Sequence, residues 1–518
     1  MINIREPVQI ELFDYYQSQM SPVAYTRLTS SYYAVFRSVI LSLLPASELA
    51  EHFDPVFGAP TKELYSMAGL AVLQQFHTWT AEEASDAYMF DIRVHFALNL
   101  AGSDKISCCS RTVERYWKLI KEDDLASEIF DRVTAKLLKE LGIEIDQQRL
   151  DSTHVFSDMA TFARTKLMGV CIKRFLTQLK RHQLGAYNAL PESLLTPYEK
   201  RANALFADAG NSTEKRSFLR QEVAEQMHYL IQHFSGNGKV ENMDTYKKMV
   251  TVFNEQCEVV DNIEVLNSAT AQDKKDITQD DKAENDKPTS DTPGNGTLES
   301  GSKKSKEGEF NDGPKVVVRE KTGGNVIQNP SDPNATYDGH KGVGYQVQIA
   351  ETSNPENDIQ LVTSVLAQTA VESDANALLP ILNDLENKNI MPGEMLADTL
   401  YGGDENVLAA EKLGVELVCP VPGPPPKKEP KKPTEKQLRL KRRREEQESE
   451  EWRKRYNPRA QIEGTIGSIK RRTSMVRLRY RGKDSVFSAI YLKLAGWNIS
   501  RALKSVWMKS KLARIVSG

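Results

Sequence analysis

A long polar stretch in the middle of the chain, from Asn267 to about Gly313, most constrains how this sequence can fold. It is rich in Asp, Lys, Ser, Thr, Gly and Asn and nearly lacks large apolar residues. Such a stretch buries too little apolar surface to offset the entropy lost on ordering, so we expect a disordered linker. The 518 residues must therefore fold from segments on either side of it, and they suffice for two or three domains.

The segments before the linker are mostly helical in pattern. Apolar side chains recur at helical spacing in 64–73 and 88–98, and Thr80 and Glu83 fit a capping box between them. The segment Ser110–Trp117 starts with Ser as a candidate cap and carries Arg and aromatic residues. Short helices in series fit a DNA reader of the helix-turn-helix type, and they fit a plain helical bundle equally well.

Strand patterns appear on both sides of the linker. Residues 143–156 have β-favouring side chains in rough alternation, whereas the helical spacing from Thr165 to about Val265 predicts a long helical insertion. Further strands are expected at 344–350, 359–365, 393–397 and 415–419, and helices at 374–382 (shortened or kinked by Pro380), 405–413, 437–455, 457–472 and 485–514. Without the insertion, this order predicts an α/β unit with a mixed five-stranded sheet, preceded by an all-α region.

We therefore expect seven segments. They are a helical N-terminal domain for DNA-end recognition (1–140), the first strand of the core (141–164), the helical insertion (165–265), the linker (266–320), the rest of the sheet (321–423), a charged Pro/Lys-rich insertion (424–450) and C-terminal helices (451–518).

The net charge of −3 conceals a strongly basic end. From Lys427 onward there are 27 Lys and Arg against 9 Asp and Glu, a net of +18, which leaves −21 for the remainder. A basic end of this size favours nucleic acid as a partner, although a solvated tail without a specific partner is the alternative. No apolar run approaches the roughly 20 residues of a membrane span, and no signal peptide pattern is present, so we expect a cytoplasmic protein without a membrane partner.

Three acids stand where strands and a helix could bring them together. Asp151 lies on the first predicted strand, Asp398 ends the fourth, and Glu463 lies on a helix after the fifth. If the fourth strand pairs with the first, the two aspartates become neighbours, and a packed helix can add the glutamate. Three carboxylates in one place repel one another, and divalent cations relieve that repulsion. Each acid taken singly is as well explained as a surface carboxylate.

The helix around Glu463 carries a narrow charged stripe. Asn457 and Pro458 suit its N-cap and first position. At about 100° per residue, Arg459, Glu463 and Lys470 fall within about 40° of one another. The stripe fits a helical salt bridge, and it also fits a metal ligand flanked by phosphate-binding cations.

Several motifs resemble those of a known family. The spacing Tyr456-x-x-Arg459-x-x-x-Glu463-x-x-x-x-x-x-Lys470 is similar to the Tyr-Arg-Glu-Lys signature of bacterial insertion-sequence DDE transposases of the insertion-sequence-four superfamily. Leu150-Asp151-Ser152-Thr153 and Ala397-Asp398-Thr399-Leu400-Tyr401 resemble the family's two aspartate blocks, with Leu400 in place of a small residue. The layout looks most like the eleven-eighty-two subgroup.

This resemblance implies a ribonuclease-H-like core that cleaves the transposon end and transfers the 3′-hydroxyl strand into target DNA. It implies Asp151, Asp398 and Glu463 as catalytic ligands of two Mg²⁺ ions, for which Mn²⁺ can substitute, and Tyr456, Arg459 and Lys470 as DNA contacts, with Arg471 and Arg472 extending the basic surface. The implied partners are double-stranded DNA, as terminal inverted repeats and as target, and a second copy of the chain. Two alternatives remain open: a ribonuclease-H-like nuclease without joining activity, and a domesticated DNA-binding protein without catalysis.

Overall fold

The computed structural model describes residues 1–7, 14–101, 106–158, 163–206, 213–260, 315–426 and 432–517, and these residues form two compact units. One unit joins residues 1–161 with 327–518, and the other spans 162–326. The predicted linker lies largely outside the described residues. Its last part does not fit the prediction, because residues 315–318 form a strand.

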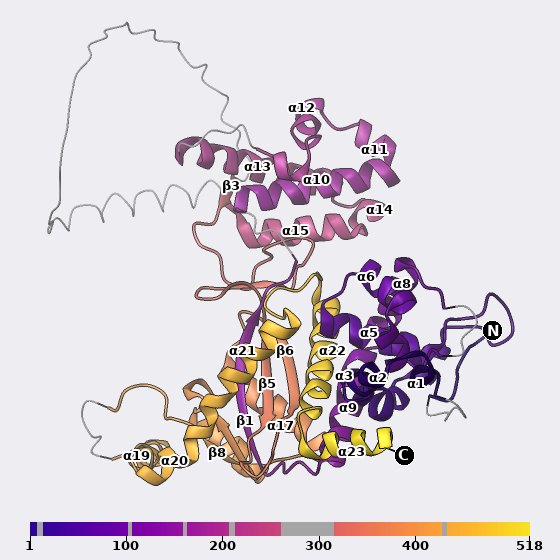
Figure 1. Cartoon of the computed structure of the whole chain (residues 1–518). Helices are drawn as coiled ribbons and strands as arrows, with labels where there is room; N and C mark the ends of the chain where they lie inside the picture. The colour runs from indigo at the N-terminus through magenta and orange to yellow at the C-terminus, as the bar shows by residue number, and fades with distance from the viewer. Residues whose placement is uncertain are drawn as a thin grey trace, which may run out of the picture. The chain divides into compact units, whose positions relative to one another are not determined.

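A mixed sheet lies at the centre of the first unit, so the chain has an α/β fold (Figure 1). The strand order is β4-β5-β1-β7-β8, and β6 also pairs with β5. β1 is antiparallel to β5 and parallel to β7. The strands are β1 (Gln147–Val155), β4 (Thr336–Asp338), β5 (Gly342–Thr352), β6 (Val362–Thr369), β7 (Glu394–Ala397) and β8 (Glu416–Val418).

The expectation of five strands is wrong, because β4 adds a sixth. β4 has only three residues and pairs with the start of β5 across a tight turn, where the Asp338 carboxylate accepts hydrogen bonds from the backbone N–H groups of His340 and Lys341. A segment this short shows no alternation that a sequence pattern could reveal.

Helices cover both faces of the sheet. Leu150 of β1 faces a core formed with α17, α18, β7 and β8. Val155, which points to the opposite face, belongs to a larger core that includes residues of α21 and α22. The helices that follow the sheet strands are η5 (Asp374–Ala377), α17 (Leu378–Asn387), η6 (Thr399–Tyr401), α18 (Asp404–Lys412), α19 (Glu435–Gln447), α20 (Glu450–Tyr456), η7 (Asn457–Ala460), α21 (Gln461–Thr473), α22 (Lys483–Ala502) and α23 (Val506–Ser517).

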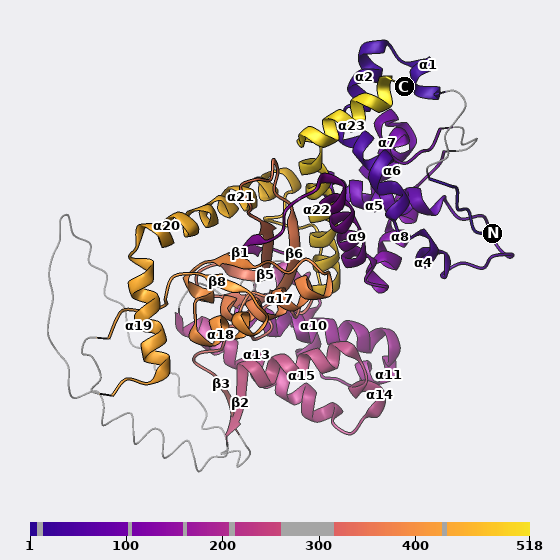
Figure 2. The same ribbon diagram turned by 90° about the horizontal axis from the view of Figure 1, so that it is seen from below.

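The observed helix boundaries differ from the predictions at three places. Pro380 neither kinks nor shortens α17, because the helix begins at Leu378 and proline is tolerated in a first turn. The predicted helix 437–455 is two helices, with Ser449 capping the second. Asn457 is not an N-cap, since its backbone is already helical and η7 runs on from α20 into α21. In Figure 2, α20 and α21 form one long rod, with α19 at an angle to it.

The N-terminal helices share their core with the sheet. α22 is buried along nearly its whole length and packs against α5, α9 and β6 (Figure 1). The capping box of Thr80 and Glu83 starts α6, as predicted, whereas Ser110 is the first residue of α8 and its side chain makes no cap hydrogen bond. These helices are α1 (Tyr15–Gln19), α2 (Pro22–Thr29), α3 (Tyr32–Val35), η1 (Phe36–Ile40), η2 (Leu41–Leu43), α4 (Ala46–Ala50), α5 (Leu64–His77), α6 (Ala81–Phe90), α7 (Ile92–Ala97), α8 (Ser110–Glu122) and α9 (Leu125–Leu141).

The second unit is mainly helical, with α10, α13 and α15 packed on one another around buried residues such as Phe175 and Met249. β2 and β3 pair antiparallel, with Cys257 opposite Val318, so β2 adds a strand where only helix was expected and β3 adds one where the linker was expected. Its elements are α10 (Arg164–His182), α11 (Leu184–Asn188), α12 (Glu192–Leu195), η3 (Thr196–Tyr198), η4 (Ala202–Ala204), α13 (Thr213–Phe234), α14 (Gly238–Glu241), α15 (Asp244–Gln256), β2 (Cys257–Val260) and β3 (Lys315–Val318). No helix in the described part of the chain is long and apolar enough to span a membrane.

Candidate active site

Asp151 and Asp398 lie side by side on neighbouring strands. β1 and β7 run parallel and pair Leu150 with Ala397. The residue that follows Leu150 is Asp151, and the residue that follows Ala397 is Asp398. Asp398 directly follows β7 and caps η6, where its Oδ1 accepts a hydrogen bond from the N–H of Leu400 at 2.8 Å. The Asp151 Oδ1 accepts one from the N–H of Ser152 at 2.8 Å. Parallel pairing of these two strands thus brings together two acids that are far apart in sequence.

A single arginine contacts both aspartates and Glu463. The Nη2 atom of Arg459 is 3.1 Å from Asp151 Oδ2 and 3.8 Å from Asp398 Oδ2. Its Nη1 atom is 2.8 Å from Glu463 Oε1, one turn further along the rod. Arg459 and Asp151 are largely buried, with side-chain exposures of 14% and 13%, whereas Glu463 is 65% exposed. The three acids therefore converge on one positive charge beside two inner strands of the sheet.

The pKa shifts at this cluster follow from burial and crowding. Burial raises the pKa of Asp151; Arg459 and the Ser152 N–H lower it, and Asp398 and Glu463 raise it further, so the net pKa is raised. For Arg459, burial alone lowers the pKa, but the neighbouring acids and Tyr456 raise it and prevail. The cluster is thus short of positive charge even with the guanidinium in its centre.

A buried ion pair holds the Glu463 helix against β1. Arg149 lies two residues before Asp151, on the same face of the strand, and pairs with Glu351 directly opposite on β5 at 2.8 Å. The same guanidinium donates hydrogen bonds to the carbonyl oxygen of Pro458 at 2.9 Å and to Gln461 Oε1 at 3.0 Å. On the other side, the hydroxyl of Thr465 donates to Glu351 Oε1 at 3.0 Å. Arg149 and Glu351 thereby fix the start of α21 over the strand that carries Asp151.

The sequence interpretation missed this pair. The signal was present as Glu351, the one charged residue of its strand segment, and as Arg149 in the strand segment that also carries Asp151. Arg149 and Glu351 are buried to 3% and 1% side-chain exposure, and charges at such positions are rarely left unpaired. The sequence could not show that Arg149 and Glu351 lie opposite each other, because they are 202 residues apart.

Tyr456 and Lys470 also lie near the acids. The ring of Tyr456 stacks on Trp452 with centroids 4.8 Å apart. Burial raises the pKa of Tyr456, and the nearby charges of Asp398 and Asp151 raise it further against Arg459. Burial lowers the pKa of Lys470, helped by the positive charge of Lys341, while Asp151 opposes the change. Lys341, in the turn before β5, is therefore a further cation near Lys470 that the sequence did not single out.

Arg471 and Arg472 face away from the acids. Both line a groove of about 590 Å³ on the other side of α21. The guanidinium of Arg472 lies 5.2 Å from the ring centroid of Phe76 on α5. Of the five predicted DNA contacts, the structure therefore gathers Tyr456, Arg459 and Lys470 near the acids and leaves Arg471 and Arg472 on a separate surface.

A buried polar network supports the block that follows Asp398. Tyr401 is fully buried, and its hydroxyl donates to Gln348 Oε1 on β5. The amide nitrogen of Gln348 donates in turn to Asp374 Oδ1 at 2.7 Å. Burial raises the pKa of Tyr401 well above its ordinary value, and the charge of Asp374 adds to this, so Tyr401 remains a neutral donor. Leu400, which follows in the same block, points outward and is 58% exposed.

The donor chemistry at the acids suits a hard divalent cation. Mg²⁺ prefers carboxylate oxygens, and Asp151, Asp398 and Glu463 already surround one cationic group. Among the described residues, however, no three side chains of His, Cys, Asp or Glu lie close enough together to bind one ion. The residues fit a metal in kind, while Arg459 stands between them as the charge that balances the acids.

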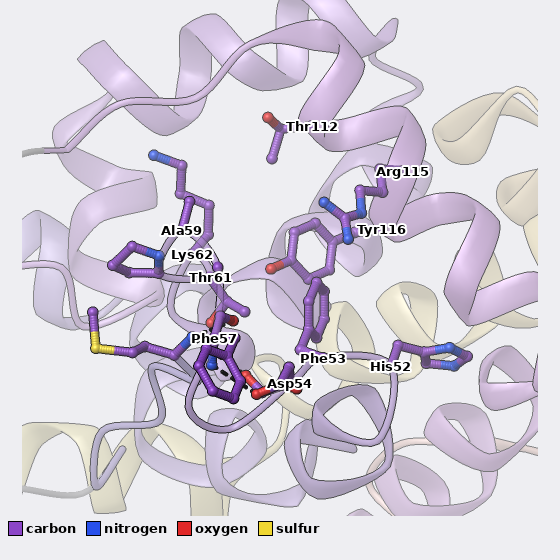
Figure 3. A pocket seen from close by; sticks show the side chains of 13 residues that line it. His52, Phe53, Asp54, Phe57, Ala59, Thr61, Lys62, Thr112, Arg115 and Tyr116 are labelled. Carbon is purple, nitrogen blue, oxygen red and sulfur yellow. Dashed lines mark hydrogen bonds between the residues drawn. The ribbon is translucent and has the colours of Figure 1, made fainter.

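The segment predicted to read DNA, Ser110–Trp117, forms the first part of α8. Its Val113 and Tyr116 are buried in the core, and Trp117 stacks on Tyr480 with centroids 4.8 Å apart. Arg115 stays exposed, 4.9 Å from the ring centroid of Phe53, beside a pocket of about 370 Å³ (Figure 3). Figure 3 shows Thr112, Arg115 and Tyr116 on one side of this pocket and Lys62 opposite. The aromatic residues of this segment thus stabilise the core, and a role in DNA reading remains a prediction.

Comparison with known proteins gives one family match. Residues 426–503 match the model of a family described as "Transposase DDE domain". The matched region runs from before α19 to the end of α22 and contains Arg459, Glu463 and Lys470. Searches of curated proteins and of solved structures found no match.

Proposed function

We propose that Asp151, Asp398 and Glu463 are the acids with which this chain cuts and joins DNA strands. The proposal starts from the match of residues 426–503 to the transposase DDE family. The observation that carries the proposal is their convergence on Arg459 from three separate elements. Only Glu463 lies within the matched segment, and the parallel pairing of β1 with β7 supports the inclusion of the two aspartates.

In this proposal the three carboxylates would hold Mg²⁺, or Mn²⁺ in its place. When bound, such ions supply an activated water or 3′-hydroxyl and stabilise the leaving oxygen of a phosphodiester. The protein's own part is to fix the ligands. The Ser152 and Leu400 N–H groups orient Asp151 and Asp398, and the Arg149–Glu351 pair orients the helix of Glu463. The mixed sheet with helices on both faces is compatible with a ribonuclease-H-like core.

Tyr456, Arg459 and Lys470 are proposed to bind the DNA strand at the scissile phosphate. All three lie near Asp151. Arg459 and Lys470 carry positive charge, which would attract the phosphates of DNA to a place where the acids repel them. Arg459 would exchange its carboxylate partners for a phosphate as the cations enter. The expected DNA partners are the element's terminal inverted repeats and a target duplex, with a second copy of the chain to hold the second end. Membership of the eleven-eighty-two subgroup is part of the same proposal.

A joining assay tests the proposal. Purified protein with Mg²⁺ should join a labelled duplex that carries the element's own end to a target plasmid. Glu463→Gln should abolish joining and leave binding of the same duplex nearly unchanged. Cleavage without a joined product would instead favour a nuclease, and binding without either reaction would favour a protein that has lost catalysis. Activity that survives in Glu463→Gln would remove Glu463 from the site.

A further inference from the structure

The side of α21 that faces away from the acids carries a groove lined by positively charged side chains. Arg471 and Arg472 of α21 face Arg501 of α22 and the following Lys504 across it, and no carboxylate lines it. In the part of the chain that the structure describes, none of these four cations is ion-paired with an acid. Arg149 lies at the base of the groove, but its charge is already balanced by the buried Glu351. Four cations without an ion-pair partner around one cavity create a site that favours a polyanion.

This groove is separate from the face of α21 that meets the acids. At about 100° per residue, Thr465 and Arg472 lie about 160° to 180° away from Glu463 around the helix. The apolar face of α21, with Ile462 and Ile469, is buried in the core and lies between them on the other side. One helix therefore presents the acid cluster on one face and the cationic groove on another.

The remaining groove lining suits a sugar–phosphate backbone. Thr465 and Ser468 offer hydroxyl groups, and Gly464 leaves open space, since a Cβ added there would meet no atom within 4 Å. The only aromatic side chain in the lining, Trp497, is 6% exposed and offers no free ring on which a base could stack. Cations and hydroxyls without a stacking surface favour the backbone of a duplex over a single strand.

We infer that this groove, lined by Arg471, Arg472, Arg501 and Lys504, binds the phosphate backbone of duplex DNA at a site distinct from the scissile phosphate. The inference rests on the proposed function, because that function supplies DNA as the polyanion. The groove grips DNA without reading its sequence. It gives α21 a second hold on DNA, so a duplex that crosses the helix is fixed on both sides of Glu463.

The test measures DNA binding without metal, so that no strand is cut. A labelled duplex of mixed sequence is titrated over a range of salt concentrations with the double variant Arg501→Gln/Lys504→Gln. The matched control is Lys139→Gln/Lys412→Gln, which removes the same charge from two exposed lysines on α9 and α18. The groove variant should bind at least about tenfold more weakly than the control, and the slope of log K against log salt should be smaller by about 2. Equal affinity and slope in the two variants would overturn the inference, and so would a loss confined to a single-stranded probe.

A second variant tests the groove without changing its charge. Gly464→Gln fills open space beside Thr465 and should weaken duplex binding, while circular dichroism shows an unchanged fold. Full duplex affinity in this variant would count against the groove. Failure of the two ideas can be told apart, because absent joining with groove-dependent binding refutes only the proposed chemistry. Joining by wild type together with control-like binding by both groove variants refutes only the groove.

Discussion

Arg149 and Glu351 face each other across β1 and β5 as an ion pair that is almost wholly buried, with Nη2 and Oε2 2.8 Å apart. Arg149 also contacts the start of the rod that carries Glu463, and Thr465 contacts Glu351 from the same rod. Stability and placement of the proposed catalytic helix therefore depend on one pair of side chains.

Removal of one partner of this pair should be costly. Glu351→Gln leaves the Arg149 guanidinium buried without a counter-charge, and we expect the free energy of unfolding to fall by about 3–5 kcal/mol. Urea denaturation followed by circular dichroism measures this. Glu450→Gln, which breaks the exposed i, i+4 pair with Lys454, is the control and should cost about 0.5 kcal/mol or less. Equal costs for the two variants would mean that the buried pair is unimportant for stability.

Arg459 should compete with divalent cations for the three acids. Arg459→Ala removes the positive charge between them, and we expect the protein without DNA to bind Mn²⁺ about tenfold more tightly, a change of about 1.4 kcal/mol. Isothermal titration calorimetry with MnCl₂ measures the affinity. Arg471→Ala removes the same charge from the far side of α21 and should leave the affinity near that of wild type. Weaker Mn²⁺ binding in Arg459→Ala would show that the arginine supports the metal site.

Lys493 should make stability depend on pH. It is 2% exposed, and its Nζ donates to the carbonyl oxygens of Gln75 and Thr473, each at 2.7 Å, at the ends of α5 and α21. Burial lowers the pKa of Lys493 from 10.5 to about 7, and the charge of Arg479 adds to this. The folded protein therefore binds fewer protons at this side chain than the unfolded chain between about pH 7 and 10.5.

Because the unfolded chain binds more protons at Lys493, a rise in pH stabilises the folded protein. Stability should rise with pH in this window, by up to about 1.4 kcal/mol per pH unit, and the contribution should be constant below pH 7. The comparison is with Lys493→Met, which lacks the titrating group and should show a flatter profile in denaturant titrations between pH 7 and pH 9.5. Parallel profiles for the two proteins would mean that Lys493 titrates normally.

Gly344 should not accept a side chain. A Cβ at this position of β5 would lie 2.4 Å from the carbonyl oxygen of Val155 and 2.8 Å from His154 Nε2, close to the end of β1. The backbone oxygen cannot move cheaply, so Gly344→Ala should destabilise the protein by about 1–3 kcal/mol. Gly464→Ala is the matched control, because its Cβ meets open space and alanine favours a helix by about 1 kcal/mol. Thermal melts of the two variants should therefore shift in opposite directions.

The sequence predicted the features that local pattern governs. The alternation in β5, the capping box at Thr80 and the helical spacing around Glu463 are each contained within a few residues. The family motif added a fixed set of side chains, and the structure brings Asp151 and Asp398 next to each other as the expected strand pairing requires.

Features that depend on distant partners could not be predicted. The register that sets Arg149 against Glu351, and the contact of Lys493 with the ends of α5 and α21, join parts of the chain far apart in sequence. Likewise, nothing local shows that Arg459 contacts both aspartates in addition to Glu463, or that Arg472 faces away from them. Helical spacing placed Arg459 and Glu463 on one stripe, but only the neighbouring strands determine which face of α21 meets the sheet.

The pairing of β1 with β7 also affects the order in which the protein can assemble. Gln147 meets Glu394, which is 247 residues further along the chain. At about 5–20 residues per second, a ribosome needs roughly 10–50 s to make the intervening chain. Until β5 has been made, late in that interval, β1 has neither of its neighbours in the sheet, and its apolar face is a target for chaperones or for other chains. The acids should therefore come together late in folding, after the N-terminal helices and the residues between the two strands have been synthesised.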